Sequence, residues 1–377
     1  FFFREDRWEV SFFLTFRIRF RAVMEPDKLG LLVDAQDPEL AELDVAAIEK
    51  LAAGAELEKI DAASELGDAQ LPLRFDDEES EVNFLAVIAA LDFGDGWRTS
   101  IVALTGRPYE ELVTFALMSQ HISGDPLSAD SLANLSLFNL GNVLNLPITE
   151  EVEVAPCIRQ DKPSHHKPLV ERYYSVLQNI ALRLQETGFP SLGRFILHPG
   201  SAHAKGKPSG ASEPESAASL IARLSGTFAC FSDAPTHPGT DQKLPFNRKA
   251  ATLARRLQSR FPASLPLPGA ESLPAGADLQ TLRLLVGHNL VTLSNALRAK
   301  LVAKPCITAN AETEIALRAC AAVAVDRLGK ALTTRAGREV PPAIALTFLR
   351  NLEGEVGEAA ESGEGDGAGV RGGDGAR

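Results

Sequence analysis

Apolar residues recur along most of this chain at spacings of three and four, which is the period of an amphipathic helix. In residues 169–187 this stripe comprises Val170, Tyr173, Tyr174, Leu177, Ile180, Ala181 and Leu184. The same spacing predicts further helices at 248–261, 278–302, 312–328 and 341–352. Alternation typical of strands is confined to short stretches, chiefly residues 151–155. The pattern therefore predicts an all-α or α-dominated protein with a single multi-helix domain.

One apolar run ends at a corner that differs from the rest of the chain. Residues 83–91 are apolar with hardly a polar break, which predicts a helix buried on most sides. The next residues are Asp92 and Phe93, then a Gly-Asp-Gly turn that ends the helix, then Trp97. Two aromatic side chains beside a carboxylate suit a flat, hydrogen-bonding heterocycle. A buried helix that ends in an ordinary turn accounts for the same residues equally well.

Segments with little to bury delimit the predicted domain. Residues 199–219 are rich in Gly, Ser and Pro and predict a surface loop inserted between helices. Residues 353–377 are mostly glycine, alanine and acid, which predicts a disordered tail. We therefore expect one helical domain over 36–352, preceded by a poorly ordered leader at 1–35. Further loops are predicted at 233–245 and 262–277.

The first 23 residues alternate aromatic side chains with Arg, Glu and Asp and lack a methionine, whereas Met24 begins an ordinary acidic leader. Read-through in the gene model, or a fragment, is the favoured explanation, and an Arg-rich organelle targeting segment is the alternative. Glu5, Asp6 and Glu9 count against a transit peptide, because such peptides are poor in acid. The expected location is therefore the cytoplasm, or an organelle if these residues are a targeting signal.

Charge and composition narrow the classes of partner. A net charge of −12 argues against proteins that hold nucleic acid on an extended basic face, whereas a small anionic substrate needs only one basic pocket. No stretch reaches the roughly 18 to 20 apolar residues of a membrane span. The four cysteines lack CxxC spacing, the histidines lack metal-ligand spacing, and a lone G-x-G-x-x-G at 367–372 falls in the predicted tail. We expect a small-molecule substrate and no metal, nucleotide cofactor, nucleic acid or membrane.

Asp278 is the strongest candidate for chemistry, because it stands where a Pro/Gly-rich loop becomes an amphipathic helix. The simplest interpretation is a helix N-cap, in which the carboxylate accepts hydrogen bonds from the first N–H groups. A carboxylate at such a junction also suits a cleft, where it activates water or stabilises the positive charge on a ribosyl ring as an N-glycosidic bond breaks.

Two charged pairs add to this candidate site. Arg248 and Lys249 begin a predicted helix, where the helix dipole disfavours cations, so a second purpose is indicated. Glu314 and Arg318 lie four residues apart on another predicted helix, a spacing that brings their side chains together. An ordinary helix-surface ion pair accounts equally well for Glu314 and Arg318.

Taken in order, these segments resemble the queuosine salvage protein family over about residues 71–350. The residues of the corner that match are Leu91, Asp92, Phe93 and Trp97. Residues 167–192 and 216–233 resemble helices of the family scaffold. The resemblance implies a helical fold similar to DNA glycosylases. It also implies hydrolysis of queuosine 5′-monophosphate at its N-glycosidic bond, which releases queuine for insertion into transfer RNA.

The resemblance assigns a role to each candidate residue. Asp278 is implied as the catalytic carboxylate, Asp92 as the partner of the base between Phe93 and Trp97, and Arg248 with Lys249 as the ligands of the 5′-phosphate. Glu314 and Arg318 are implied to support the site from behind. The chain departs from the family motifs at three positions: Asn247 replaces Tyr, Leu282 replaces Pro and Ala316 replaces Glu. No cofactor and no metal are implied.

Two other functions fit parts of the sequence. Residues 267–272 faintly resemble the Leu-Pro-Gly hairpin of DNA glycosylases, but the second glycine of that hairpin is missing and the acidic charge disfavours duplex DNA. A non-enzymatic helical scaffold is the second rival, since substitutions at Asn247, Leu282 and Ala316 alter the family motifs.

Overall fold

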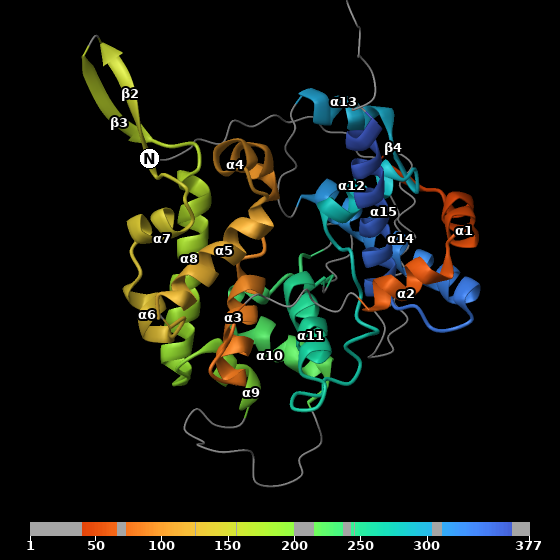
Figure 1. The fold of residues 1–377 in the computed structure, drawn as a ribbon, viewed down its shortest axis with the longest axis horizontal. Coiled ribbons are helices and arrows are strands. Elements are labelled where there is room, and N and C mark those ends of the chain that lie inside the picture. The colour runs from red at the N-terminus through yellow and green to blue at the C-terminus, as the bar shows by residue number, and fades with distance from the viewer. Residues whose placement is uncertain are drawn as a thin grey trace, which may run out of the picture.

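The computed structural model describes residues 40–65, 73–124, 126–155, 157–199, 215–236, 243–244, 246–303 and 311–363. The protein is predominantly α-helical, as the apolar spacing predicted (Figure 1). The expectations for residues 1–35, for most of the 199–219 loop, for Cys306 and for the tail beyond 363 fall outside the described residues.

The helices of the first half are α1 Val45–Ala53, α2 Leu57–Glu65, α3 Glu78–Ala90, α4 Arg98–Thr105, α5 Tyr109–Ile122, α6 Ala129–Asn134, α7 Leu137–Val143, α8 Lys167–Thr187 and α9 Leu192–Leu197. Those of the second half are α10 Ala217–Thr227, α11 Arg248–Arg260, α12 Leu279–Gly287, α13 Asn295–Ala303, α14 Glu312–Ala336 and α15 Pro342–Gly363. Single turns of 3-10 helix, η1 and η2, occupy Asp95–Trp97 and Ala229–Phe231.

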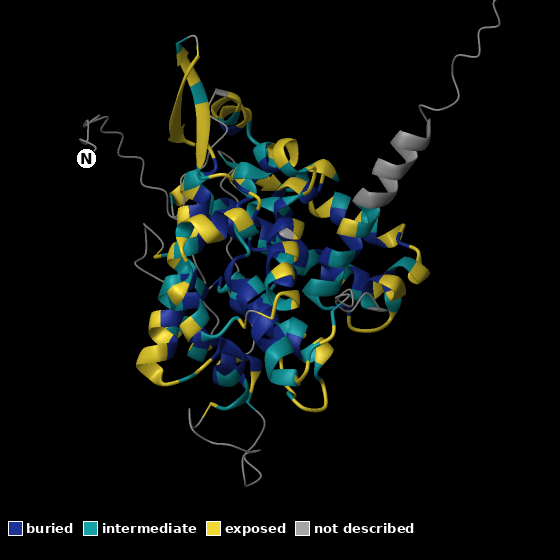
Figure 2. Ribbon diagram, turned by 60° about the vertical axis from the view of Figure 1, so that its left-hand side comes forward, coloured by how far each residue is buried: buried dark blue, intermediate teal, exposed yellow. Residues whose placement is uncertain are grey.

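The strands form two small antiparallel pairs. Strand β1 (Ala41–Leu43) pairs with β4 (Val291–Leu293), so that Glu42 lies opposite Thr292. Strand β2 (Thr149–Ala155) pairs with β3 (Ile158–Pro163) in a hairpin that projects from the helices and is exposed along most of its length (Figures 1 and 2). The sequence predicted only residues 151–155 of β2, because the other strands are short and get their stability from pairing.

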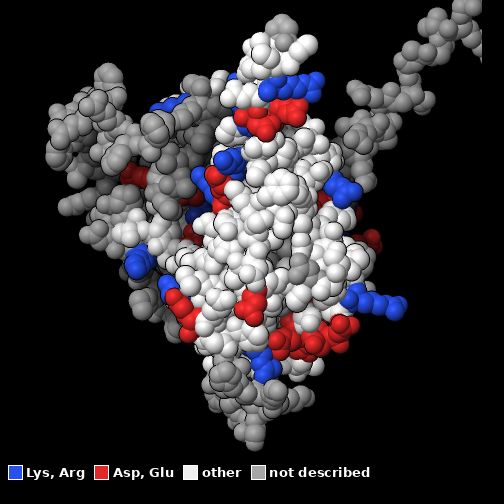
Figure 3. Space-filling model, turned by 90° about the vertical axis from the view of Figure 1, so that its left-hand side faces the viewer, with Lys and Arg blue, Asp and Glu red and all other residues white. Residues whose placement is uncertain are grey.

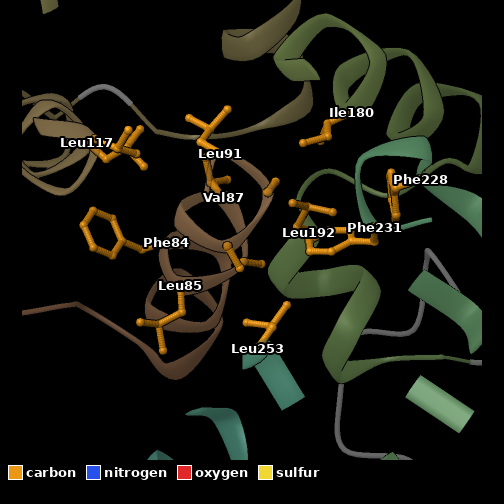
Figure 4. Close-up of a cluster of buried hydrophobic side chains, with 14 of the residues drawn as sticks. Phe84, Leu85, Val87, Leu91, Leu117, Ile180, Leu192, Phe228, Phe231 and Leu253 are labelled. Carbon is orange, nitrogen blue, oxygen red and sulfur yellow. The ribbon is translucent and has the colours of Figure 1, made fainter. Parts of the chain in front are cut away.

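Helix α3 is the centre of the larger hydrophobic cluster, as its apolar sequence predicted. Eight of its residues are buried, and α5, α9 and α11 pack around it. Phe84, Val87 and Leu91 project from α3 toward its neighbours, which contribute Leu117, Leu192 and Leu253 (Figure 4). The one buried polar side chain of α3, Asn83, is satisfied by the Leu127 carbonyl and the Gly193 N–H.

A second hydrophobic cluster joins α1 and α2 to α12–α15, which come from opposite ends of the chain. Helix α15 packs on α2, α12 and α14, while α11 belongs to the first cluster. In Figure 1, α11 lies between the helices of the two clusters. The boundary between the clusters is therefore lined by α3, α11 and α15.

The predicted helix over 278–302 is wrong, because it is broken into α12, β4 and α13. Helix α12 ends at Gly287, and Asn289 then adopts a left-handed conformation with φ of 58°. Asn tolerates this conformation, and the following Val-Thr-Leu pairs with β1. The apolar period alone did not reveal the break, since β4 buries Val291 at a position that also fits a helix.

The prediction that the folded chain ends at residue 352 also needs correction. Helix α15 continues to Gly363, eleven residues into the segment expected to be disordered. Residues 353–363 contain four Glu and two Ala, which are strong helix formers, so the helix continues although the segment has three Gly and few apolar residues.

Charged side chains are unevenly distributed over the surface of the protein. The face around α6, α7 and α8 is mostly uncharged, and its charged side chains lie toward its edges (Figure 3). Among the described residues, no helix combines the length and apolarity needed to cross a membrane.

Candidate functional site

A cleft of about 620 Å³ opens along the boundary between the two hydrophobic clusters. Its walls come from the C-terminal end of α3, from α5 and α11, from the loop before α12, and from α15. The described charged residues that line it are Asp92, Asp278, Arg248, Lys249, Arg255, Arg256 and Arg350. The cleft thus brings together four of the residues selected from the sequence, although Asp92 and Asp278 are 186 positions apart in the chain.

Asp92 and Arg248 form a two-point contact in this cleft. The Arg248 Nη1 donates to Asp92 Oδ2 at 2.6 Å, and Nη2 donates to the backbone carbonyl of Asp92 at 2.7 Å. Burial alone would lower the pKa of Arg248, but Asp92 and then Asp278 raise it above its usual value. Arg248 is therefore held to the end of α3. Among the described residues, Oδ1 of Asp92 has no hydrogen-bond partner.

Lys249 lies beside this pair and also binds the end of α3. Its Nζ donates to the Ala90 carbonyl at 2.7 Å and lies 4.4 Å from the centre of the Phe93 ring. Burial, with a smaller contribution from Arg248, lowers the pKa of Lys249 to about 8. The two cations at the start of α11 thus stabilise the carbonyl end of α3, where the helix dipole favours positive charge. This is the second purpose that their unfavourable position in their own helix indicated.

The structure does not place Phe93 and Trp97 among the described residues that line the cleft. The ring of Phe93 packs on Tyr173 of α8, with ring centres 4.7 Å apart, and its carbonyl accepts a hydrogen bond from the Tyr173 hydroxyl. Trp97 lies under the guanidinium of Arg172, 5.4 Å from the ring centre. The expected aromatic pair around a base is thus not formed here, because α8 packs against the corner from the other side.

Gly94 explains how closely the corner approaches α8. Its φ is 135°, and a Cβ at this position would lie 2.8 Å from the Tyr173 hydroxyl oxygen. Only glycine fits both conditions. The turn therefore fixes the direction in which Asp92 leaves α3.

Asp278 combines the two roles that the sequence left open. Its Oδ1 accepts a hydrogen bond from the Thr281 N–H at 2.7 Å and caps α12, while the residue also lines the cleft. No described residue bonds its Oδ2. The preceding loop is shaped by Gly276, whose φ is 78° and where a Cβ would lie 2.8 Å from Val325. One oxygen of Asp278 is therefore structural and the other is available.

Leu282, at the family's proline position, leaves this cap intact. Its N–H donates to the Asp278 carbonyl at 3.2 Å, a bond that proline cannot make, and its side chain is buried in the second hydrophobic cluster. Asn247 has a φ of 41°, which asparagine tolerates better than most residues, and its N–H donates to the Asp233 carbonyl at 2.9 Å. At both positions where the chain departs from the family motifs, the residue present thus forms a backbone hydrogen bond that stabilises the local structure.

Arg318 binds the loop before Asp278 on the side away from the cleft wall that Asp278 forms. Glu314 is one of the partners of Arg318. Arg318 is 8% exposed, and its Nε donates to the Ala277 carbonyl at 2.8 Å. Its other nitrogens bond Glu314, at 3.3 Å, and Asp233. The residues four apart on α14 therefore meet, as their spacing predicted. A buried arginine links α14, the segment after η2 and the residue next to Asp278.

Sequence reasoning missed several residues of the cleft, notably Tyr109, Arg255 and Arg350. Arg255 and Arg350 each lie within a predicted helix, and nothing in the sequence distinguishes them from solvated surface arginines. Within the described part of the chain, no group of three or more His, Cys, Asp or Glu residues is arranged to hold a metal ion. Burial raises the pKa values of Cys230 and Cys320 to about 11, so neither thiol is activated as a nucleophile.

The model of the queuosine salvage protein family matches residues 192–349. This segment is similar to the queuosine salvage family. The match confirms the resemblance noted in the sequence for the part of the chain from α9 into α15, which includes Arg248, Lys249, Asp278 and Arg318. Asp92 lies outside the match, and Arg350 directly follows it. Among curated proteins, none matches the chain. The family domain supports a role in queuosine salvage.

Proposed function

We propose that this protein is an enzyme that hydrolyses the N-glycosidic bond of queuosine 5′-monophosphate and releases queuine. The proposal is supported by the queuosine salvage domain and, above all, by Asp278, which that domain contains and which lines a cleft of about 620 Å³. Its unoccupied Oδ2 is the group that the chemistry requires. A cleft of this size is typical of small-molecule sites.

The cap on α12 prepares Asp278 for this reaction. Because Oδ1 accepts the Thr281 N–H, the carboxylate is held in one orientation, and its second oxygen, Oδ2, is bonded by no described residue. The cap places this carboxylate at the N-terminus of α12, on the wall of the cleft. An anion fixed in this way stabilises an oxocarbenium-like ribosyl group without reorganisation.

The reaction is balanced as a hydrolysis. The bond between the ribose C1′ and the base nitrogen breaks, and its electron pair leaves with the base. Water forms the new bond to C1′ and gives one proton to Oδ2 of Asp278, and this proton then passes through solvent to the base nitrogen, which restores the Asp278 carboxylate. The products are queuine and ribose 5-phosphate. In this scheme Oδ1 of Asp92 hydrogen-bonds the amino or amide edge of the base, while Arg248 holds the Asp92 carboxylate in place.

The test is release of queuine and ribose 5-phosphate from queuosine 5′-monophosphate by the 377-residue chain, compared with its Asp278→Asn variant. General acid–base assistance contributes about 100- to 10,000-fold, so kcat of Asp278→Asn should fall by at least about 100-fold. Asp77→Asn is the matched control, since Asp77 caps α3 in the same way and does not line this cleft.

Each outcome decides between the proposals. Release by the wild type and Asp77→Asn but not by Asp278→Asn supports the hydrolase and the role of Asp278. Equal release by all three proteins contradicts the role of Asp278. No release by wild-type protein with the expected helical circular dichroism contradicts the hydrolase and supports a non-catalytic scaffold.

A further inference from the structure

The hairpin of β2 and β3 exposes both of its outer edges. It projects from the helices (Figures 1 and 2), every residue of β3 is exposed, and no residue of β2 is buried. A two-stranded hairpin is at best marginally stable by itself, and the backbone groups along its edges can pair with a further strand. The hairpin is therefore a candidate interaction surface.

The pairing register shows which backbone groups of β3 face outward. At the base of the hairpin, the Ser164 N–H donates to the Ile148 carbonyl at 3.1 Å. Antiparallel pairs alternate between hydrogen-bonded and non-hydrogen-bonded, so the even-numbered residues of β3 bond to β2. Arg159, Asp161 and Pro163 therefore direct their backbone groups away from β2. Pro163 fits this position, since proline has no N–H to give to the ladder.

The charges along this edge are not balanced within the hairpin. Arg159 forms an ion pair with Glu151 at 3.1 Å, but the register places Asp161 directly opposite the same Glu151. Like charges that lie opposite each other destabilise a strand pair, and side chains are closest in non-hydrogen-bonded pairs such as this one. In the described part of the chain, no cation forms an ion pair with Asp161.

A second copy of β3 would provide that cation. When two β3 strands pair antiparallel about Gln160, Arg159 of each copy lies opposite Asp161 of the other. The outward-facing backbone groups of these residues then meet, so each of the two pairs exchanges two hydrogen bonds. Pairing about Arg159 or about Asp161 also aligns the backbone, but it places two like charges opposite each other. Backbone geometry and charge thus select the same register.

The outer edge of β2 does not offer the same contact. Its outward-facing residues include Glu151 and Glu153, so self-pairing there would place acid opposite acid. Charged side chains on an edge strand prevent the addition of further strands, and a bulge between Glu153 and Ala155 interrupts this edge near the tip. Pairing through β3 uses both β3 edges, so association closes as a two-fold dimer.

We propose that two copies of this chain associate by antiparallel pairing of their β3 strands, which joins the two hairpins into one four-stranded sheet. In this dimer, Ile158 of each copy lies opposite Lys162 of the other. The alkyl stem of the lysine then covers an isoleucine that is 57% exposed in the single chain. The residues of this contact do not line the cleft of Asp278, so the dimer does not depend on the proposed hydrolase function.

The first experiment measures the mass of the 377-residue chain by sedimentation over a range of concentrations. The contact is small, so the dimer should have a dissociation constant of about 10 μM to 1 mM. Asp161→Lys should raise this constant at least about tenfold, because it places a lysine opposite Arg159 of the other copy. The same substitution improves the pair with Glu151 inside the hairpin, so a loss of dimer is not explained by an unfolded hairpin. Arg183→Glu, on the exposed surface of α8, is the control and should not change the constant.

Mixing two charge variants tests the register. Arg159→Asp should not self-associate, because acid then faces acid, and Asp161→Arg should not, because base then faces base. An equimolar mixture should form a heterodimer, since each acid of the first variant faces a base of the second. If the wild type dimerises but the mixture does not, the dimer forms elsewhere and the β3 contact is overturned.

Oxidative cross-linking detects even a weak dimer. Gln160 faces its own copy in a non-hydrogen-bonded pair, where Cα atoms are about 4.5 Å apart and a disulfide can form. In a Cys157→Ser background, Gln160→Cys should therefore give a covalent dimer. Lys162→Cys should not, because Lys162 faces Ile158. Equal cross-linking of the two variants contradicts the register, and a monomeric wild type with no cross-linking of Gln160→Cys overturns the dimer.

Discussion

The guanidinium of Arg248 bonds both the side chain and the backbone carbonyl of Asp92, across 156 positions of sequence. Asp92 lies two residues beyond the end of α3, the central helix of the first cluster, and Arg248 begins the helix that runs along the cleft. The pair therefore fixes the angle between α3 and α11 at the point where the cleft opens. Loss of this contact should therefore change both the stability of the protein and the shape of the cleft.

Arg248→Met should destabilise the protein by about 2 to 3 kcal/mol, because it leaves the partly buried carboxylate of Asp92 without its partner. Urea denaturation of Arg248→Met, Asp92→Asn and the double variant measures the coupling, which should be about 1 to 3 kcal/mol. The same cycle on the exposed pair Arg183 and Glu186 should give less than about 0.5 kcal/mol. A coupling as small as that of the exposed pair would refute the structural role of the contact.

Asp278 should separate stability from activity according to the residue that replaces it. Asn keeps an oxygen that accepts the Thr281 N–H, so Asp278→Asn should unfold within about 0.5 kcal/mol of the wild type. Asp278→Ala removes the cap and should cost about 1 kcal/mol. Both variants should lack hydrolase activity. If Asp278→Asn retains activity while Asp278→Ala loses it, the cap and not the charge is what the site needs.

Arg318→Met should be the most destabilising of these substitutions. It leaves the carboxylates of Asp233 and Glu314 without their shared cation in a buried position, which costs about 3 to 5 kcal/mol. Thermal unfolding followed by circular dichroism measures the loss. Arg159→Met, in the exposed hairpin pair with Glu151, is the control and should shift the midpoint little. A similar small shift for Arg318→Met would mean that the network does not stabilise the loop before Asp278.

Lys249 should make part of the stability depend on pH above 8. Its pKa is about 8 in the folded protein, against an ordinary value of 10.5, so the unfolded state binds more protons between these values. The free energy of unfolding contributed by Lys249 therefore rises as pH increases from 8 to 10.5. The difference in stability between the wild type and Lys249→Met should grow by roughly 1 to 3 kcal/mol over this range.

The control for this pH dependence is Lys330→Met, since Lys330 is an exposed lysine of α14 paired with Asp326. Its difference from the wild type should stay constant over the same range. A constant difference for Lys249→Met as well would show that its ammonium is not desolvated.

Helix positions were predictable because they depend on local spacing. The stripe on α8 from Val170 to Leu184 is buried except for the half-buried Tyr174. Helix α11 occupies the predicted segment, and the apolar run that ends at Leu91 forms the buried helix α3. Each requires only that apolar residues recur with the helical period. The break after Gly287 was not predictable in this way, since β4 forms only when β1 pairs with it from the other end of the chain.

The sequence by itself determined the helical class, the resemblance of residues 192–349 to the queuosine salvage family and the choice of Asp92, Arg248, Lys249 and Asp278 as candidate residues. Tertiary structure decided which partners these residues have. It bonded Arg248 to Asp92, turned Phe93 toward Tyr173, and brought Arg255 of α11 to the same cleft as Arg350 of α15. The physical reason is that the two hydrophobic clusters combine segments far apart in the chain, and the angle at which they meet is set by packing that no local pattern encodes.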